Sequence, residues 1–380
     1  MPNQIPTRDV VLLGAGHTNA HVLRMWKQRP LPDARLTCIS NFPVATYSGM
    51  LPGVLAGQYR PEQMEIDLAK LCTAAKARLI VAEVASVDVA GRKIRFADES
   101  AISFDVLSIG IGSVPTTEGV AIAEDTLVSI KPMQTFLGRL ESRLLTWRDR
   151  ALDEPLQIVI VGAGAGGVEI AFCLPPRVVS VLGNVPTQLT VVSAQQDVLS
   201  GVSRRTVERV QRELALRGVK CVLGRRVSRV SGGVVTCADG GELQADIVIW
   251  ATGAAASPLL KQIALPKDKR GFLLTAPTLK TLADAPIFAV GDCGTIERFP
   301  TAKAGVYAVR EAPVLWNNIR RQLRGIPLQA YAPQSGFLKL LNTGDGRAIG
   351  EFRSLSIQGR WAWKLKDAID RRFIANYQVG

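Results

Sequence analysis

Two glycine-rich segments have the composition and spacing of phosphate-binding turns. The first reads Gly14-Ala15-Gly16-His17-Thr18-Asn19, and the second reads Gly162-Ala163-Gly164-Ala165-Gly166-Gly167. The first glycine of each would permit a tight turn, and the next, Gly16 or Gly164, would let the backbone approach a pyrophosphate. A helix that begins at such a turn points free N–H groups and partial positive charge at the bound anion. The two segments therefore predict two dinucleotide sites.

The flanking residues supply the context that the turns require. Apolar runs typical of buried strands, Val10–Leu13 and Ile158–Val161, precede them, and helical patterns follow to Arg29 and Cys173. Asn19 stands where the third glycine of the pattern is expected, and we expect its side chain to loosen the packing of the first helix on its strand.

The remaining pattern repeats in the same order in both halves. The first copy continues with expected strands at 36–40, 84–88, 93–96 and 104–110; the second has expected strands at 189–192, near 227 and 234 and at 246–253, and a helix at 202–217. This predicts an α/β fold of two doubly wound, Rossmann-like dinucleotide-binding domains with a small C-terminal segment.

Neither copy has the acidic residue that commonly binds a ribose after the second strand. Ser40-Asn41 and Ser193-Ala194 occupy these places. Without a carboxylate in the second copy, nothing repels a 2′-phosphate, so both NADH and NADPH remain open. Arg204 and Arg205 either hold that phosphate or, as we favour, belong to the solvated face of a basic helix.

Composition limits the class of protein. The chain has 380 residues, 47% of them hydrophobic and 21% charged, with a net charge of +13. The charge favours phosphate-rich cofactors or anionic lipid, and no helix-turn-helix or aromatic–basic pattern indicates nucleic acid. Six cysteines without a Cys-x-x-Cys pair indicate reduced thiols in the cytoplasm and no metal site. Met1–Asp9 has no apolar run that indicates a secretory signal, and the glycines in 156–174 argue against a membrane span there.

Later segments make the resemblance specific. Ala251-Thr252-Gly253 and Ile287-Phe288-Ala289-Val290-Gly291-Asp292, together with the duplication, resemble the pyridine nucleotide-disulphide oxidoreductase superfamily. Without a redox cysteine pair, the chain looks more like the type II NADH dehydrogenase branch. Segments 14–22, 47–53, 341–348 and 366–373 are most similar to the flavoprotein module fused to selenide, water dikinase.

The resemblance implies an organisation and an activity. FAD would lie on residues 1–130 and 271–325 and NAD(P)H on 151–270, with an amphipathic helix in the C-terminal segment 326–380. A hydride from NADH or NADPH would pass to flavin N5, and electrons would then reach a quinone-like acceptor. The alternatives are reduction of a selenium or sulfur compound, or a non-enzymatic flavoprotein that senses redox state.

The resemblance also assigns roles to residues. Asp292 would bind the FAD ribitol, Val84 the adenine, and 43–52 would run past the isoalloxazine. Glu169 would lie near the nicotinamide, and Lys303 would lie at a helix start facing the flavin. The residues expected to bind FAD are Gly14, Ala15, Gly16, His17, Thr18, Asn19, Ser40, Asn41, Val84, Gly291, Asp292, Lys303 and Ala304. Those expected to bind NAD(P)H are Gly162, Gly164, Gly166, Gly167, Glu169, Ser193 and Gly253.

Three further side chains that could react are expected to have structural roles. We expect His21 and Cys293 to be packed, and His17 to contribute its backbone to the first turn.

Near the C-terminus, apolar residues recur on one helical face. They are Trp361, Leu365, Ile369, Phe373 and Tyr377, flanked by Arg360, Lys364, Lys366, Arg371 and Arg372. This pattern is typical of a helix on the cytoplasmic face of an anionic membrane, and equally of a helix docked on its own domain or on the second copy of a homodimer.

Overall fold

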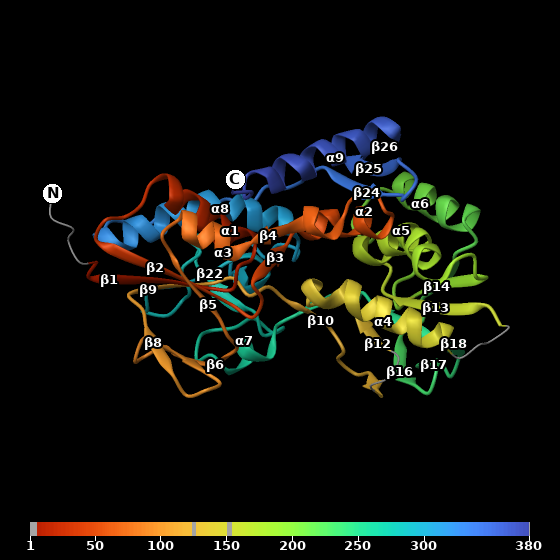
Figure 1. The fold of residues 1–380 in the computed structure, drawn as a ribbon, viewed down its shortest axis with the longest axis horizontal. Coiled ribbons are helices and arrows are strands. Elements are labelled where there is room, and N and C mark those ends of the chain that lie inside the picture. Colours follow the sequence, from red (N-terminus) through yellow and green to blue (C-terminus); the bar gives the residue numbers. More distant parts are fainter. Residues whose placement is uncertain (1–5, 124–126, 150–153, 380) are drawn as a thin grey trace.

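The protein, seen in a computed structural model, is described over residues 6–123, 127–149 and 154–379. Residues 1–5 of the N-terminal segment and the expected boundary at 151 lie outside the described residues. Two five-stranded parallel sheets lie side by side, and the C-terminal helix runs across both along the top of Figure 1. This confirms the predicted α/β fold with two dinucleotide-binding domains.

The first sheet has the strand order β22-β9-β1-β2-β5. Its strands are β1 (Arg8–Leu13), β2 (Ala34–Ser40), β5 (Arg78–Val81), β9 (Val106–Ile109) and β22 (Ile287–Ala289). Helices α1 (His17–Gln28), α3 (Leu68–Ala74) and α8 (Gly305–Arg324) cover one face. On the other face lies a small sheet of β6 (Val84–Asp88), β7 (Lys93–Phe96) and β8 (Ala101–Ser103). Alternating side chains of β1 enter two cores: Val10 and Leu12 face the helices, whereas Val11 and Leu13 face the small sheet.

The second sheet repeats this plan in the order β12-β19-β13-β14-β15. Its strands are β12 (Leu127–Ser129), β13 (Leu156–Val161), β14 (Thr187–Ser193), β15 (Lys220–Leu223) and β19 (Ile247–Trp250). Its helices are α4 (Phe136–Arg148), α5 (Ala165–Leu182) and α6 (Arg204–Leu216). A four-stranded sheet of β11 (Ala121–Ile122), β16 (Val227–Ser231), β17 (Val234–Cys237) and β18 (Glu242–Gln244) covers the opposite face.

Short elements complete the two units. They are β3 (Val44–Thr46), α2 (Leu51–Leu55), β4 (Glu65–Asp67), β10 (Val114–Pro115), β20 (Ala254–Ala255), α7 (Pro258–Gln262), β21 (Leu273–Thr275) and β23 (Gly294–Ile296). The antiparallel pair β10–β20 crosses between the units.

Helix α5 is longer than the sequence indicated, because it continues through Pro175 and Pro176 to Leu182. Leu174 and Val178 on either side of the prolines are buried, and their burial offsets the hydrogen bonds that the prolines cannot donate. Within the described part of the chain, α5 alone has the length and hydropathy of a membrane-crossing helix, with 44% of it buried. Its buried side packs against α2 and α4.

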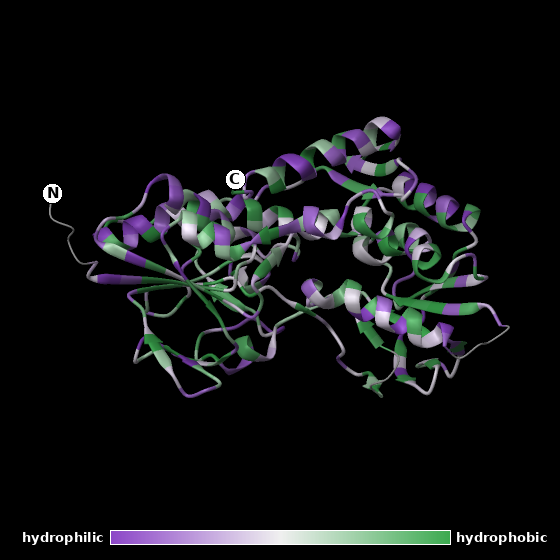
Figure 2. Cartoon of the chain, in the orientation of Figure 1, coloured by the Kyte–Doolittle hydropathy of each residue, from purple (hydrophilic) through white to green (hydrophobic). Residues whose placement is uncertain are grey.

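The C-terminal segment forms a three-stranded antiparallel sheet and a helix. These are β24 (Lys339–Asn342), β25 (Ala348–Phe352), β26 (Leu355–Gly359) and α9 (Arg360–Ala375). The sheet lies against α5 and α6 of the second unit, and α9 packs on the sheet. Figure 2 shows that the surface of α9 mixes apolar and polar residues along its length.

Asn19 strengthens the packing of α1 where we expected it to weaken it. The side chain is fully buried, and its amide nitrogen donates to the carbonyl oxygens of Gly14 (2.8 Å), Ser108 (3.3 Å) and Leu13 (3.4 Å). Its oxygen accepts from the Ser108 hydroxyl at 2.6 Å. The space freed by Gly110, whose added Cβ would lie 2.7 Å from the Asn19 amide, accommodates the larger side chain.

Replacing Asn19 by alanine should therefore lower the free energy of unfolding by about 1–3 kcal/mol, because a buried hydroxyl and a turn carbonyl lose their partner. Urea unfolding followed by circular dichroism measures the change. The exposed Asn184 is the matched control, and an Asn19→Ala variant as stable as Asn184→Ala would contradict the assignment.

Candidate flavin and dinucleotide site

Both glycine turns pack tightly against the end of a neighbouring strand in their own sheet, β9 for the first turn and β19 for the second. Gly14 has φ +86°, and a Cβ there would lie 2.7 Å from the carbonyl oxygen of Gly110 at the end of β9. Gly162 has φ +115°, and its Cβ would lie 2.3 Å from the carbonyl oxygen of Ala251 at the end of β19. Only glycine fits both the conformation and the space, so the first position of each turn requires glycine for the same physical reason.

The residues at each turn fit a pyrophosphate. Neither α1 nor α5 has a capping side chain or an acidic residue in its first turn, so their first N–H groups are available to an anion. A Cβ added at Gly164 would meet no atom within 4 Å, so the space in front of the second turn is open. Gly166 is similarly open, whereas a Cβ at Gly167 would lie 1.9 Å from the Gly162 carbonyl oxygen, so Gly167 allows the close approach of helix and strand.

Asp292 lies at the edge of the first sheet formed by the carboxyl ends of its strands, in the 3₁₀ turn Gly291–Cys293 that follows β22. Its carboxylate accepts from the Ser113 hydroxyl at 2.6 Å and from Lys131 Nζ at 3.1 Å. Burial raises the pKa of Asp292, but Lys131, the Ser113 bond and Lys303 together hold it below its usual value. The group is therefore a carboxylate, ready to accept from a ribitol hydroxyl.

Neither Lys131 nor Ser113 was expected from the sequence. Ser113 lies between β9 and β10, and Lys131 follows β12 of the second sheet; both are far along the chain from Asp292 and belong to no motif. Lys131 Nζ also donates to the Ser113 hydroxyl at 2.7 Å, so the three side chains form one network.

Helix α8 begins at Gly305, beside the first turn. A Cβ on Gly305 would lie 3.3 Å from the His17 ring, and Ala304 at its N-cap makes no side-chain bond. Lys303 points toward β23: its ammonium donates to the Gly294 carbonyl and, at 3.0 Å, to the Thr295 hydroxyl, above the Phe272 ring. Lys303 contributes positive charge near Asp292 from this position.

A buried thiol, Cys293, and a buried carboxyl group, Glu311, lie next to the turn that carries Asp292. Cys293 is fully buried and its sulfur accepts from the Gly112 N–H at 3.1 Å; burial raises its pKa to about 12, so it is a neutral packed thiol as expected. Glu311 of α8 accepts from the Gly291 N–H at 2.6 Å, and burial raises its pKa to about 7. Glu311 thus holds the turn that presents Asp292.

Glu169 of α5 lies at the junction of the two units and the C-terminal segment. Its carboxylate accepts from the Asn342 N–H at 2.8 Å. Burial raises its pKa to about 7, although Lys366 and the Asn342 bond oppose the shift. Lys366 of α9 reaches the same region and donates to Asp370 and to the Gly49 carbonyl, both at 2.8 Å.

An aromatic cluster closes the first turn. Tyr47 stacks on Phe373 with centroids 4.2 Å apart, and the His17 ring lies 5.4 Å from both. Tyr47 donates to Asp370 at 2.9 Å. Burial lowers the pKa of His17 to about 4, so its imidazole is neutral, and its side chain takes part in the cluster beyond the backbone role that we expected. His21 is half-buried, and burial lowers its pKa to about 4.

The expected apolar stripe of α9 is divided. Phe373 and Tyr377 pack inward, but Trp361, Leu365 and Ile369 are 55%, 39% and 45% exposed. The buried row is offset by one position and consists of Ala362, Lys366, Asp370 and Ile374. The prediction of one continuous apolar face was wrong. The face of α9 that packs inward includes Lys366 and Asp370, which are buried because they bind each other and further partners.

The residues that we expected to bind the two riboses lie at the carboxyl ends of β2 and β14. Ser40 ends β2, next to exposed Asn41, and its carbonyl accepts from the Ala82 N–H at 3.1 Å, close to Val84 at the start of β6. Ser193 ends β14. Gly253 follows β19, and a Cβ there would meet no atom within 4 Å. Arg204 pairs with Glu208 at 3.0 Å on the solvated face of α6, in line with the favoured interpretation.

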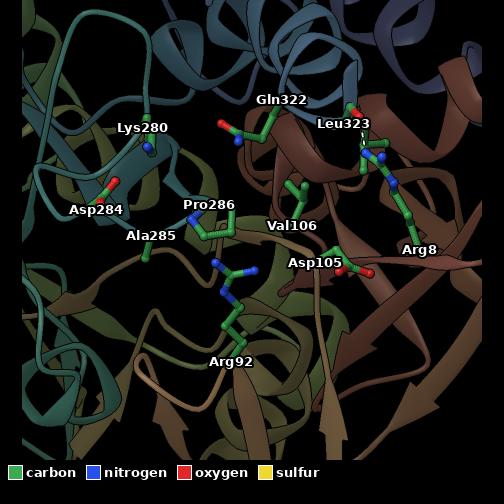
Figure 3. Close-up of a pocket in the computed structure, with 10 residues that line it drawn as sticks. All are labelled: Arg8, Arg92, Asp105, Val106, Lys280, Asp284, Ala285, Pro286, Gln322 and Leu323. Carbon is green, nitrogen blue, oxygen red and sulfur yellow. Dashed lines mark hydrogen bonds between the residues drawn. The ribbon is translucent and has the colours of Figure 1, made fainter. Parts of the chain in front are cut away.

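A separate cavity of about 280 Å³ lies at the opposite end of the first sheet, where β9 and β22 begin. Figure 3 shows Arg92, Lys280 and Asp284 around it, with Arg8 bound to the Leu323 carbonyl at one side. Ligands of open α/β sheets bind at the carboxyl ends of the strands, so this cavity is distinct from the crevice of the two turns.

Comparison with known proteins agrees with this geometry. The sequence profile described as pyridine nucleotide-disulphide oxidoreductase matches residues 8–312. The chain belongs to the pyridine nucleotide-disulphide oxidoreductase family. Family membership confirms that it is an enzyme and confirms the expected cofactors, FAD with NADH or NADPH.

Two relatives of this oxidoreductase match over nearly their whole length. An NADH dehydrogenase-like protein of Bacillus subtilis is 24% identical over 95% of this chain and 97% of its own. A type II NADH:quinone oxidoreductase of Staphylococcus saprophyticus is 25% identical over 97% and 95%. The solved structure of NDH2 from Plasmodium falciparum in complex with NADH shares the fold, with a TM-score of 0.81 at 14% identity and 97% coverage of both chains.

The raised pKa of Glu169 predicts a pH-dependent stability. The folded protein keeps the proton up to about pH 7, whereas the unfolded chain loses it near its ordinary pKa of 4.5. The stabilisation is therefore present below that lower pH and is lost as pH rises through this window. Glu169→Gln should flatten the fall in unfolding free energy across the window, measured by urea titration at each pH. Exposed Glu208→Gln serves as control, and a slope unchanged by Glu169→Gln would show that the carboxyl is not shifted.

Asp292→Ala should weaken FAD retention. The variant removes a charge-assisted acceptor worth about 1.5–3 kcal/mol, which corresponds to roughly a tenfold to hundredfold rise in the dissociation constant. Fluorescence titration of the apoprotein with FAD gives the value. Exposed Asp197→Ala is the control, and equal FAD affinity of the two variants would remove Asp292 from the flavin site.

Proposed function

We propose that the protein is an FAD-dependent NAD(P)H dehydrogenase that passes electrons to a quinone-like acceptor. The observation that carries the proposal is the pair of turns, each fitted to a pyrophosphate and each packed on the next strand of its own sheet. Relatives of matching length that are named as NADH dehydrogenases or NADH:quinone oxidoreductases support the same activity.

The chain's own residues bind and orient the two dinucleotides. When bound, FAD would accept a hydride at N5 from the nicotinamide, which is cofactor chemistry. The second turn and the N-terminus of α5 would hold the nicotinamide dinucleotide, with Glu169 one turn into the same helix. The first turn, Asp292 and the start of α8 would hold FAD, and the positive end of α8 would favour negative charge on the reduced ring.

Proton supply fits a quinone-like acceptor, since its reduction consumes two protons. Glu169 and Glu311 have pKa values near 7 because of burial, so each can hold a proton at neutral pH and release it. Glu169 is further linked to the C-terminal segment through Asn342.

The exposed part of α9 supports attachment to a lipid surface. Trp361, Leu365 and Ile369 form an apolar row in solvent, and Arg372 lies on the same side of the helix with Lys364 and Arg371 beside it. An apolar row bordered by cations is typical of helices on anionic membranes, where a quinone would be available.

Gly164→Val should block flavin reduction by NADH and by NADPH while FAD stays bound. The valine side chain would occupy the open space before the second turn, and because it meets no protein atom the fold should be kept. Anaerobic stopped-flow absorbance of the flavin measures the step. Exposed Gly138→Val in α4, equally free of contacts, is the control; flavin reduction at the parent rate in Gly164→Val would refute the second site.

A panel of acceptors tests the second half of the reaction. With the flavin reduced, we expect re-oxidation to be fastest with a short-chain quinone and slower with selenium or sulfur compounds. If only the selenium or sulfur compounds re-oxidise the flavin quickly, the acceptor is such a compound and not a quinone. If NAD(P)H is not consumed with any of the acceptors, a redox-sensing role is favoured.

Ile369→Glu should release the protein from anionic vesicles without changing its melting temperature, because Ile369 is exposed. Phe373→Glu on the same helix should instead lower stability, because its partly buried carboxylate would replace the ring contacts with Tyr47 and His17. Vesicle co-sedimentation at low and high salt and thermal unfolding make the comparison. If the parent protein does not sediment with vesicles, the lipid attachment is wrong.

A further inference from the structure

The ribose end of the second turn lacks the charge that an NADH site uses. In this fold the residue that ends the second strand, here β14, lies at the adenosine ribose, and a carboxylate there binds the 2′-hydroxyl of NADH. Ser193 ends β14, and Ala194, Gln195 and Gln196 follow it. None of the four carries a negative charge, so nothing at this position opposes a 2′-phosphate.

Two arginines directly follow the neighbouring strand, beside this place. β15 runs parallel to β14 and pairs Leu223 with Ser193. Immediately beyond, the Arg225 N–H donates to the Ser193 carbonyl at 2.9 Å, and the Gly224 N–H donates to the Gln195 carbonyl at 2.8 Å. The segment 224–226 is therefore tied to the loop that follows β14, and these bonds fix Arg225 and Arg226 beside the ribose end.

Both arginines are available to an anion. Each is exposed. Arg225 Nε lies 3.1 Å from Asp239, but both side chains of this pair are half-exposed, and such pairs contribute little. Arg226 has no ion-pair partner within residues 6–123, 127–149 and 154–379.

The nearest acid along the loop does not cancel this charge. Asp197 lies four residues beyond Ser193, and the loop next returns to the glycine turn, where the Leu199 N–H donates to the Ala163 carbonyl at 2.9 Å. Arg204, the other cation considered for this role, pairs with Glu208 at the start of α6. Among the described residues at the end of β14 and β15, Arg226 is thus the cation that no ion pair neutralises.

We propose that the second site selects NADPH, with Arg225 and Arg226 binding the 2′-phosphate of the adenosine ribose. The inference rests on the proposed function, because it assigns the nucleotide used by the same site. A guanidinium is always charged and presents paired donors that match a phosphate, so two of them discriminate strongly between a phosphate and a hydroxyl.

Binding of two fragments tests the site without flavin or catalysis. By calorimetry, adenosine 2′,5′-bisphosphate should bind about tenfold to a hundredfold more tightly than 5′-AMP, which lacks only the 2′-phosphate. The ratio should fall toward one in the double variant Arg225→Ala, Arg226→Ala, and below one in Ala194→Glu, which places a carboxylate on an exposed position next to Ser193. Exposed Arg229→Ala, which removes the same charge three residues further along, should keep the parent ratio.

Flavin reduction then separates this inference from the proposed function. We expect kcat/KM for NADPH to exceed that for NADH by the same factor, with the same order among the variants. Reduction by NADH as fast as or faster than by NADPH would overturn the 2′-phosphate site and leave the dehydrogenase assignment standing. If neither nucleotide reduces the flavin, the dehydrogenase assignment fails, and the fragment ratio alone decides whether the arginines select a 2′-phosphate.

Discussion

The arrangement of the two units depends on the contacts that the buried Lys366 ammonium makes. An ammonium removed from water is tolerated only with close partners, and Lys366 finds them in Asp370 of its own helix and in the Gly49 carbonyl of the first unit. Asp370 is satisfied in turn by Tyr47. The charge of Lys366 also acts on Glu169 of the second unit. One buried cation therefore binds α9 to both units at once.

Further contacts of the C-terminal segment fix the same arrangement. On the first unit, Tyr59 donates to Asp367 at 2.6 Å. On the second unit, Glu351 accepts from the Ser203 N–H and the Thr206 hydroxyl at 2.7 and 2.8 Å, and Arg217 pairs with Asp345 at 2.9 Å. The hydride transfer that we propose requires two rings at near-contact distance, so the relative position of the two units would have to be held closely. The C-terminal segment supplies that rigidity, although it contains neither glycine turn.

Local patterns made the core of both units predictable. The turns at Gly14 and Gly162 follow from backbone geometry that only glycine allows, and most strands recur within one or two residues because their apolar runs are buried. The contacts of Asp292 with Ser113 and Lys131 were not predictable, since they join residues 179 and 161 positions apart. The inward face of α9 was missed for a related reason: charged residues are assigned to solvent unless their distant partners are known. Asn19 was misjudged because the space that receives it is made by Gly110 on another strand.

The order of strands in the first sheet has a consequence for how the chain is made. β22 completes that sheet beside β9, yet every strand of the second sheet lies between them in the sequence. During synthesis from the N-terminus, the second unit is entirely outside the ribosome before β22 emerges. The first unit must then wait with the edge of β9 open, and an open edge is a template for pairing with other chains. The second unit can therefore fold before the first sheet is complete, and a nascent chain that stalls before residue 287 exposes the unfinished sheet to chaperones and proteases.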